Sequence, residues 1–411
     1  MRKGYYFAII IVVLSLIGSV AGCKQATPTT TVAKTTAAAT TSSAVGKTTV
    51  SSTTSKPVTP KLLQWAVQDI GTGGYVTVGM VSESMRDKYG VTIRVLPVGN
   101  SVGRLTLPRS GSVQLAAVTG EKYQAREAVG DFAGRAWGPQ QLRMIYYLPG
   151  SGPSSFAVRG NSGITALKDL RGQKVPWVVG LSSHNLMMEG ALAYVGLTWN
   201  DVTKVELPSY AATADAILDG KTSVVVLNPQ SPNAVRIAAA QGGIRWLGIS
   251  PSDKEAWSRF MKFKPEIIPA TLTKGTGVTG DNPVAGTSNA HTFDAYSTLD
   301  DDTAYFTTKA WVETYPLWKD KIPEDSGDID VVLDIVGKVP YAWHPGSIRY
   351  FKEIGKWTAQ HEAWNTKLLG REAGLLKAWD AFIAEADASK LTEDKLPAIW
   401  EKHRNSVPPV Q

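Results

Sequence analysis

The stretch LLQWAVQDIGTGG, residues 62–74, decides the fold. Its first six residues are mostly apolar and have the length of a buried strand, and its last six form a Gly- and Thr-rich loop. We expect a helix from this loop to about Tyr89, followed by an apolar strand over residues 91–96. Strands that alternate with helices predict a mostly parallel α/β sheet.

The same alternation continues along the chain. Asn100 and Ser101 can cap a helix, and a third strand is expected over residues 113–118. About 350 residues follow the N-terminal segments, which is enough for two domains of ordinary size. Further strands are expected at 143–148, 155–159, 175–179, 202–207, 223–227 and 244–249.

The C-terminal third of the chain is different in character. Residues 251–299 are rich in Gly, Thr and Pro, and we expect them to be irregular. Helices are expected over residues 300–320, 347–358, 359–387 and 391–404. Four tryptophans should pack the last three helices against the rest of the protein: Trp357, Trp364, Trp379 and Trp400.

The first 22 residues have the layout of a secretory signal peptide. Arg2 and Lys3 give a positive start, and the apolar run 5–17 is shorter than the roughly 20 residues of a spanning helix. The ending Val20-Ala21-Gly22-Cys23 resembles a bacterial lipobox. We therefore expect residues 1–22 to be removed and Cys23 to be lipidated; the alternative is a plain signal peptide with a cysteine nearby.

Residues 23–60 are expected to form a disordered tether. Ser and Thr make up 18 of the 37 positions from 24 to 60, and this stretch contains no acidic and no aromatic residue. Such a composition cannot bury enough surface to fold. A glycosylated stalk or an inert spacer would have the same composition.

Composition excludes several classes of function. Cys23 is the single cysteine of the chain, so the folded part has no disulfide, thiolate metal site or cysteine nucleophile. The net charge of +7 comes without a dense Lys/Arg block, which argues against nucleic-acid binding. A mild basic excess would suit an anionic small ligand.

Polar loops rich in Gly, Ser, Thr and Asn occur where expected strands end and helices begin. In open α/β sheets ligands bind at these strand ends, where free backbone N–H groups attract carboxylate or phosphate. The loop 71–74 lacks the full dinucleotide pattern and the P-loop lysine, so it can also be an ordinary turn. The later loops can simply cap helices. The loops are 71–75, 99–101, 119–121, 180–185 and 228–232.

The sequence contains no recognisable catalytic set. No two of the five histidines have metal-ligand spacing, and there is no Gly-x-Ser-x-Gly motif. Residues 300–302, Asp-Asp-Asp, fit a solvated helix N-terminus better than a cation site. We therefore expect a protein that is not an enzyme and that uses no metal and no cofactor.

Several motifs in order along the chain resemble the TAXI family, the extracytoplasmic solute-binding subunits of TRAP transporters. They are Gly-Thr-Gly-Gly at 71–74, Pro-Val-Gly-Asn-Ser-Val-Gly-Arg-Leu at 97–105, the segment 159–175, and His-Pro-Gly-Ser-Ile-Arg-Tyr-Phe-Lys-Glu at 344–353. The last of these is the most specific. The resemblance covers about residues 62–355.

The resemblance implies a two-lobed periplasmic-binding-protein fold of type II that closes on a ligand. Lobe 1 would comprise residues 61–154 plus 251–355 and lobe 2 residues 155–250, and 356–411 would be a helical C-terminal extension. The ligand-binding residues carried over from the family are Gly73, Gly74, Tyr75, Asn100, Ser101, Thr119, Glu121, Ser182, Ser183, Asn185, Asn228 and Gln230.

The chain departs from the family pattern in the ligand loops. Tyr75 follows Gly-Thr-Gly-Gly where the family often has Thr-Tyr-Tyr-Pro, and Thr119-Gly120-Glu121 stands where Gln-x-Asp is usual. The loop 180–185 lacks the usual Gly-Ser-Gly-Thr. The identity of the ligand therefore does not follow from the resemblance.

The main functional hypothesis is an exported lipoprotein of the periplasm or cell surface. It would bind a small organic anion, a carboxylate or an amino acid such as glutamate, and deliver it to the membrane subunits of a TRAP transporter. Alternatives are a binding protein of an ABC importer or a surface sensor. Further alternatives are an enzyme with Glu121 or His184 as acid–base groups and an adhesive surface protein.

Overall fold

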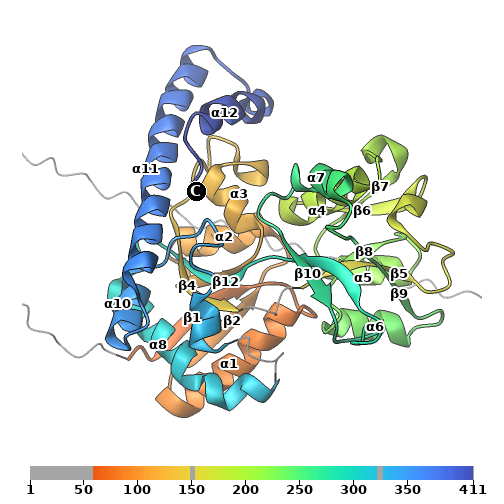
Figure 1. Cartoon of the computed structure of the whole chain (residues 1–411). Helices are drawn as coiled ribbons and strands as arrows, with labels where there is room; N and C mark the ends of the chain where they lie inside the picture. The colour runs from red at the N-terminus through yellow and green to blue at the C-terminus, as the bar shows by residue number, and fades with distance from the viewer. Residues whose placement is uncertain (1–58, 149–152, 322–326, 411) are drawn as a thin grey trace, which may run out of the picture. The chain divides into compact units, whose positions relative to one another are not determined.

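The computed structural model of the protein describes residues 59–148, 153–321 and 327–410 (Figure 1). The predicted signal peptide, Cys23 and nearly all of the predicted tether lie outside these residues. Among the helices of the described ranges, none is long and apolar enough to cross a membrane.

A five-stranded sheet is the centre of what we call the first body, meaning this sheet and the helices that cover it. β1 is parallel to β2 and β3, whereas β12 is antiparallel to both of its neighbours. The sheet is therefore mixed, with two parallel and two antiparallel pairs, and the expectation of a mostly parallel sheet is met only by β2, β1 and β3. The strand order is β2 (Thr92–Pro97), β1 (Leu62–Val67), β3 (Leu115–Val118), β12 (His291–Tyr296) and β4 (Leu142–Leu148).

Helices cover both faces of this sheet. Successive side chains of β1 point to opposite faces and join different cores. Trp65 belongs to the core shared with α1 (Gly73–Tyr89) and α8 (Asp301–Trp318). Its ring stacks on Trp311 of α8 with centroids 5.8 Å apart. Ala66 belongs instead to the core shared with α2 (Ser101–Arg109), on the opposite face (Figure 1). The sheet is therefore buried on both sides.

The second body, which we define as the elements from β5 to α7, contains two small sheets. In one, β5 (Ser155–Arg159) lies between β8 (Val225–Leu227) and β9 (Ile244–Leu247), with both pairs antiparallel. In the other, β6 (Lys174–Val178) is parallel to β7 (Thr203–Leu207). Its helices are α4 (Ser182–Tyr194), α5 (Ala211–Leu218), α6 (Pro232–Ala239) and α7 (Lys254–Met261).

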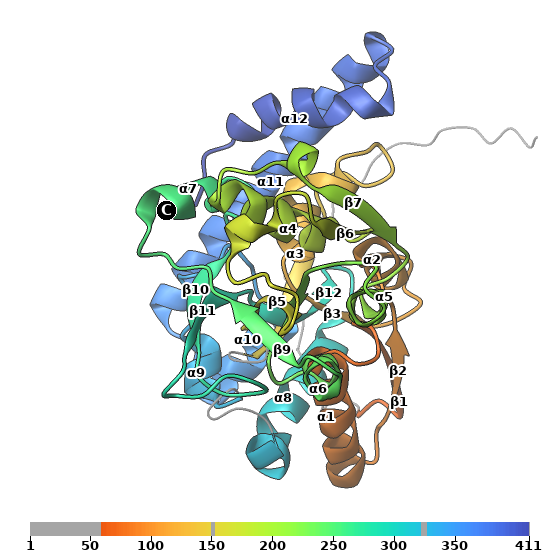
Figure 2. The ribbon, with the colours of Figure 1, turned by 90° about the vertical axis from the view of Figure 1, so that its right-hand side faces the viewer.

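Residues 251–299 are more regular than expected, so that prediction was wrong. They contain α7, the antiparallel hairpin of β10 (Ile268–Leu272) and β11 (Val284–Ser288), and β12, an inner strand of the five-stranded sheet. Figure 2 shows this hairpin beside β5 and β9. β12 was missed because buried Asp294 interrupts its apolar pattern; its carboxylate pairs with Lys122, Nζ to Oδ1 2.8 Å.

The C-terminal helices are confirmed, as is their packing through tryptophans. They are α10 (Pro345–Glu353), α11 (Ala359–Ala388) and α12 (Leu396–Asn405). Trp379 of α11 and Trp400 of α12 share a core with Ala128 of the first body. The indole Nε1 of Trp400 also donates to the backbone oxygen of Glu127 at 2.8 Å. The α/β fold with a helical C-terminal region is thus established; the exact limits of the lobes remain a prediction.

Buried ion pairs attach α11 to the first body. Arg143 of β4 donates two hydrogen bonds of 2.6 Å to the two carboxylate oxygens of Glu372, and both side chains are buried. Arg126 approaches the same carboxylate at 4.0 Å. One acidic group on α11 therefore balances two buried guanidinium groups.

Replacing Glu372 by Ala should destabilise the protein strongly, because it leaves Arg143 and Arg126 buried without their acidic partner. We expect the free energy of unfolding in urea to fall by about 3–5 kcal/mol. Glu393→Ala is the matched control, since Glu393 pairs with Arg135 at the surface, where water screens the two charges, and its loss should destabilise the protein much less. Equal losses in the two variants would contradict this account.

Candidate ligand-binding site

A cavity of about 170 Å³ lies where β1 and β3 end and α1 and α4 begin. Both bodies contribute to it, so a molecule inside it would contact each of them. The first body supplies Gln68, Asp69, Thr72, Gly73, Gly74, Gly99, Arg104, Thr119, Glu121, Asn289 and His291; the other lining residues are Ser154, Leu181, Ser183, His184, Met187, Tyr210, Val226, Asn228 and Ser231.

The N-terminus of α1 forms one wall of the cavity. The Thr72 side chain caps the helix by accepting from the Tyr75 N–H at 3.2 Å. The N–H groups of Gly73 and Gly74 belong to the first turn, where no acceptor exists within the helix. A Cβ at Gly74 would lie 2.5 Å from Oε1 of Gln68 and 2.9 Å from Cε1 of His291. Glycine therefore lets these two side chains approach the helix end closely.

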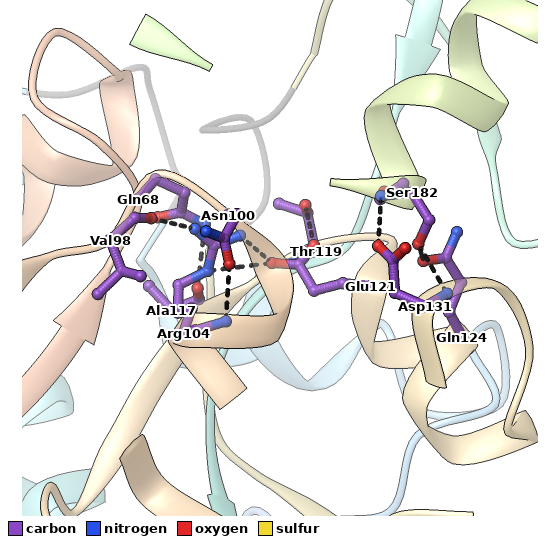
Figure 3. Close-up of polar contacts among 12 residues, drawn as sticks. Gln68, Val98, Asn100, Arg104, Ala117, Thr119, Glu121, Gln124, Asp131 and Ser182 are labelled. Carbon is purple, nitrogen blue, oxygen red and sulfur yellow. Dashed lines mark hydrogen bonds and ion pairs between the residues drawn. The ribbon is translucent and has the colours of Figure 1, made fainter. Parts of the chain in front are cut away.

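Arg104 and Glu121 form a buried ion pair in the cavity wall (Figure 3). Arg104 donates from Nε to Oε1 of Glu121 at 3.2 Å and from Nη1 to the Val98 oxygen at 2.8 Å. The other carboxylate oxygen accepts from the N–H and hydroxyl of Thr119, at 3.1 and 2.7 Å. Both oxygens of Glu121 are thus engaged, and the two charges neutralise each other.

The ion pair keeps Glu121 ionised. Burial raises the pKa of this carboxyl, but the charge and hydrogen bonds of Arg104 outweigh burial and hold the pKa below its ordinary value. Lys264, which lies behind Ser183 at 3.2 Å from its hydroxyl, is likewise paired, with Glu266 at 2.5 Å. Among the described lining residues, Arg104 is the sole Lys or Arg.

The structure brings half of the predicted ligand residues together. Six of them line the cavity: Gly73, Gly74, Thr119, Glu121, Ser183 and Asn228. The other six lie outside the lining: Tyr75, Asn100, Ser101, Ser182, Asn185 and Gln230. Their roles in ligand binding remain predictions.

Several predicted residues outside the lining have structural partners. Asn100 caps α2, its Oδ1 accepting from the Gly103 N–H at 2.7 Å. Asn185 hydrogen-bonds both backbone groups of Val178, at 2.8 and 2.9 Å. Ser182 donates from its hydroxyl to Gln124. These polar side chains are the types that ligands need, but here the backbone and neighbouring residues use them.

Sequence reasoning missed a set of lining residues: Gln68, Asp69, Arg104, Tyr210, Asn289 and His291. Gln68 directly follows β1, so its place at a strand end was a usable signal. Arg104 lies within the motif 97–105 but in the body of α2, not in its loop. Asn289 and His291 come from the region expected to be irregular, which offered no such signal.

Three buried polar groups of the lining lack a hydrogen-bond partner among the described residues. Oε1 of Gln68 and Oδ1 of Asn289 are amide oxygens without a donor. Neither ring nitrogen of His184 makes a hydrogen bond of acceptable geometry. Buried polar atoms normally have partners, so these groups are available to a bound molecule.

The two histidines of the cavity are neutral at physiological pH. Burial lowers the pKa of His184 from 6.5 to about 4, and burial does the same for His291. The ring of His184 can therefore offer one donor and one acceptor to a ligand, without charge.

The described residues contain no cluster of three or more His, Cys, Asp or Glu that could hold a metal ion. Asp300 caps α8, its carboxylate accepting from the Thr303 N–H at 2.8 Å. Asp302 pairs with Arg349 at 2.6 Å. The acidic run 300–302 is therefore a helix N-terminus, as expected.

Stability should decrease as the pH falls from about 6.5 to about 4. In this window the unfolded state binds protons at both histidines and the folded state does not, so acid favours unfolding. The loss is at most roughly 3 kcal/mol for each histidine. His184→Gln should flatten the dependence of the melting temperature on pH between 7.5 and 5. Parallel curves for wild type and His184→Gln would contradict the assignment.

Comparisons with solved structures find similarity to bacterial binding proteins. The periplasmic aliphatic sulphonate binding protein SsuA from Escherichia coli is 17% identical, covers 75% of this chain and 79% of its own, and has a TM-score of 0.40. The GluR0 ligand-binding core from Nostoc punctiforme, in complex with L-glutamate, is 14% identical, covers 64% and 99%, and has a TM-score of 0.38. Similarity at this level carries no information about the ligand.

A search of curated proteins found no significant match. The scan against family models gave a match that spans residues 72–355, from the cap of α1 to just beyond α10. This range includes every lining residue of the cavity except Gln68 and Asp69. The chain belongs to the NMT1-like family.

Proposed function

We propose that this protein captures a small molecule in the cavity, without changing it chemically, and delivers it to a transporter in the membrane. The observation that carries the proposal is the cavity itself, which is bounded by helix N-termini and unpartnered polar groups from two bodies. Small-molecule sites have this form: a mostly apolar concavity with a few polar groups that orient the ligand.

The ligand that fits best is an amino acid in its zwitterionic form. The first-turn N–H groups of Gly73 and Gly74, at the positive end of α1, suit its carboxylate. The amide oxygens of Gln68 and Asn289 need donors, which an ammonium group supplies. A plain carboxylic acid would leave these oxygens buried without partners, which is costly.

The charges of the lining favour an uncharged side chain. Arg104 is neutralised by Glu121, and Asp69 adds a further acid, so a second carboxylate would find no free cation among the described lining residues. Leu181, Met187 and Val226 offer apolar surface instead. Glutamate and dicarboxylates are therefore less suited than a neutral amino acid. The volume of about 170 Å³ is below the roughly 300–1,000 Å³ of pockets for drug-sized ligands and agrees with a molecule of this size.

The transporter that we propose is of the TRAP type, and the observation that favours it is the resemblance of residues 344–353 and the earlier motifs to the TAXI family. Lipid on Cys23 and the tether 23–60 would keep the protein near the membrane subunits, in the periplasm or at the cell surface. A binding protein of an ABC importer, or a sensor, would use the same cavity. Genes for membrane subunits beside this one would separate these cases.

An enzymatic role has little support from the geometry. Both oxygens of Glu121 are engaged with Arg104 and Thr119, so this carboxylate is not placed to exchange protons with a ligand. His184 is neutral and lacks an orienting carboxylate partner among the described residues.

Neutral amino acids should raise the melting temperature of the full chain, and their des-amino analogues should not. A ligand at 100 times its Kd stabilises the folded state by about 2.7 kcal/mol, which corresponds to a shift of several degrees. Leucine compared with 4-methylpentanoate and with leucinol tests the ammonium and the carboxylate separately, and glutamate compared with glutamine tests the side-chain charge. If the acids without an amino group bind best, the zwitterion proposal fails; if nothing in a broad screen of small molecules binds, ligand capture fails.

Gln68→Met should weaken binding of the amino acid that gives the largest shift. Losing one hydrogen bond to an ammonium costs about 1.5–3 kcal/mol, equivalent to a Kd roughly 10–100 times higher. Gln360→Met is the matched control, because Gln360 is exposed on α11, away from the cavity. Isothermal titration of both variants gives the Kd values, and equal values would remove Gln68 from the site.

A further inference from the structure

Two helices of the second body begin without caps of their own. α4 is preceded by Leu181, whose side chain cannot accept a hydrogen bond, and α5 is preceded by Tyr210, which makes no capping bond. α6 and α7, by contrast, are capped by Ser231 and Asp253. The first N–H groups of a helix need acceptors from outside it, so those of α4 and α5 require acceptors other than an N-cap side chain.

Carboxylates of the first body supply the acceptors. Oδ2 of Asp131 accepts from the N–H of Ser182, the first residue of α4, at 2.8 Å (Figure 3). Oδ2 of Asp69 accepts from the N–H of Ala211, the first residue of α5, at 3.2 Å. The next N–H of α5 is satisfied within the second body, by the Ser209 hydroxyl at 3.3 Å. Both carboxylates also lie at the positive ends of the helix dipoles, where negative charge is favourable.

We propose that Asp69 and Asp131 hold the two bodies closed over the cavity by capping α5 and α4 from the opposite body. The inference rests on the proposed function, because closure serves a purpose if the cavity holds a ligand. When the bodies separate, both helices lose an N-terminal acceptor and both carboxylates lose a favourable dipole. The two aspartates therefore position the bodies and set how long a ligand is retained.

Backbone contacts beside each cap support this assignment. Next to Asp131, the Ser101 N–H donates to the Gly180 oxygen at 3.0 Å. Next to Asp69, the Tyr210 N–H donates to the Gly99 oxygen at 3.4 Å. A Cβ at Gly99 would lie 2.7 Å from that of Ser209. The chain therefore has glycine at a point where the two bodies leave no room for a side chain.

Further side-chain bonds surround the cap of α4. The Ser182 hydroxyl donates to Oε1 of Gln124 on α3 (Glu121–Glu127) and accepts weakly from the Asp131 N–H at 3.5 Å. Ser182 and Asp131 thus bond each other in both directions. A residue that would otherwise be assigned to the ligand is, in this geometry, part of the contact between the bodies.

Amide hydrogen exchange of the full chain, measured by mass spectrometry without added ligand, tests the proposal. Asp131→Ala should speed exchange in peptides that contain Ser182, and Asp69→Ala in those that contain Ala211, by roughly five-fold if each cap has an average strength. Asp131→Asn, which keeps an acceptor but loses the charge, should give a smaller increase. If Asp131→Ala folds poorly, Asp131→Asn provides the test in its place.

Asp300→Ala is the matched control. It removes the cap of α8, whose donor Thr303 lies in the same body, so exchange should rise at the start of α8 and remain unchanged at Ser182 and Ala211. Unchanged exchange at Ser182 in both Asp131 variants, or equal effects from Asp300→Ala, would overturn the proposal.

Dissociation of leucine, or of whichever amino acid gives the largest thermal shift, provides the second readout. The aspartate variants should release it roughly five times faster, with little change in the association rate, because an open form is easier to reach. If amide exchange changes as expected and no amino acid binds, the proposed function is wrong, but the role of Asp69 and Asp131 in holding the bodies closed is supported. If exchange changes and the dissociation rate does not, the role of these contacts in retaining the ligand is wrong.

Discussion

The buried polar side chains of α3 are the constraint on which the rest of the structure depends. This helix has seven residues, and most of its polar side chains are buried, which is tolerable only if every charge has a partner. The partners come from four different parts of the chain. The bonds join Glu121 to Arg104, Lys122 to Asp294, Gln124 to Ser182, Arg126 to Glu372 and Glu127 to Arg371.

Through these bonds α3 connects features that look independent in the sequence. Its first residue is in the cavity wall, its middle residues reach the inner strand β12 and the second body, and its last residues reach α11. The position of Glu121 in the site is thus fixed from several directions, with little freedom to adapt. Under the proposed function, ligand binding would then depend on the movement of whole bodies more than on the rearrangement of loops.

The fold could be predicted where local chemistry alone decides it. The apolar run 62–67 followed by Gly-Thr-Gly-Gly gave β1 and α1, and Trp379 and Trp400 gave the packing of the last helices. β12 could not be predicted, because Asp294 looks like a surface residue until Lys122, 172 positions away, is placed against it. Long-range pairing of charges leaves no periodic signal in a single sequence.

The site could be predicted in part for the same reason. Gly73, Thr119 and Ser183 lie at strand or helix ends, where a general rule for α/β sheets locates ligands. Ser182 and Asn185 satisfy the same rule but are bound to neighbouring groups, and only the three-dimensional structure distinguishes the two situations. The unpartnered oxygens of Gln68 and Asn289 likewise could not be recognised from the sequence, because the sequence does not show which acceptor each donor bonds.

The ion pairs between α3 and α11 also have a consequence for how the chain acquires its structure. Glu127 bonds Arg371, 244 residues later, so the first body cannot satisfy its own charges until α11 has been synthesised. The bond between Arg143 and Glu372 likewise cannot form until Glu372, 229 residues later, has been synthesised. Contacts so distant in sequence make folding slow. A nascent chain shorter than this would stay incompletely folded.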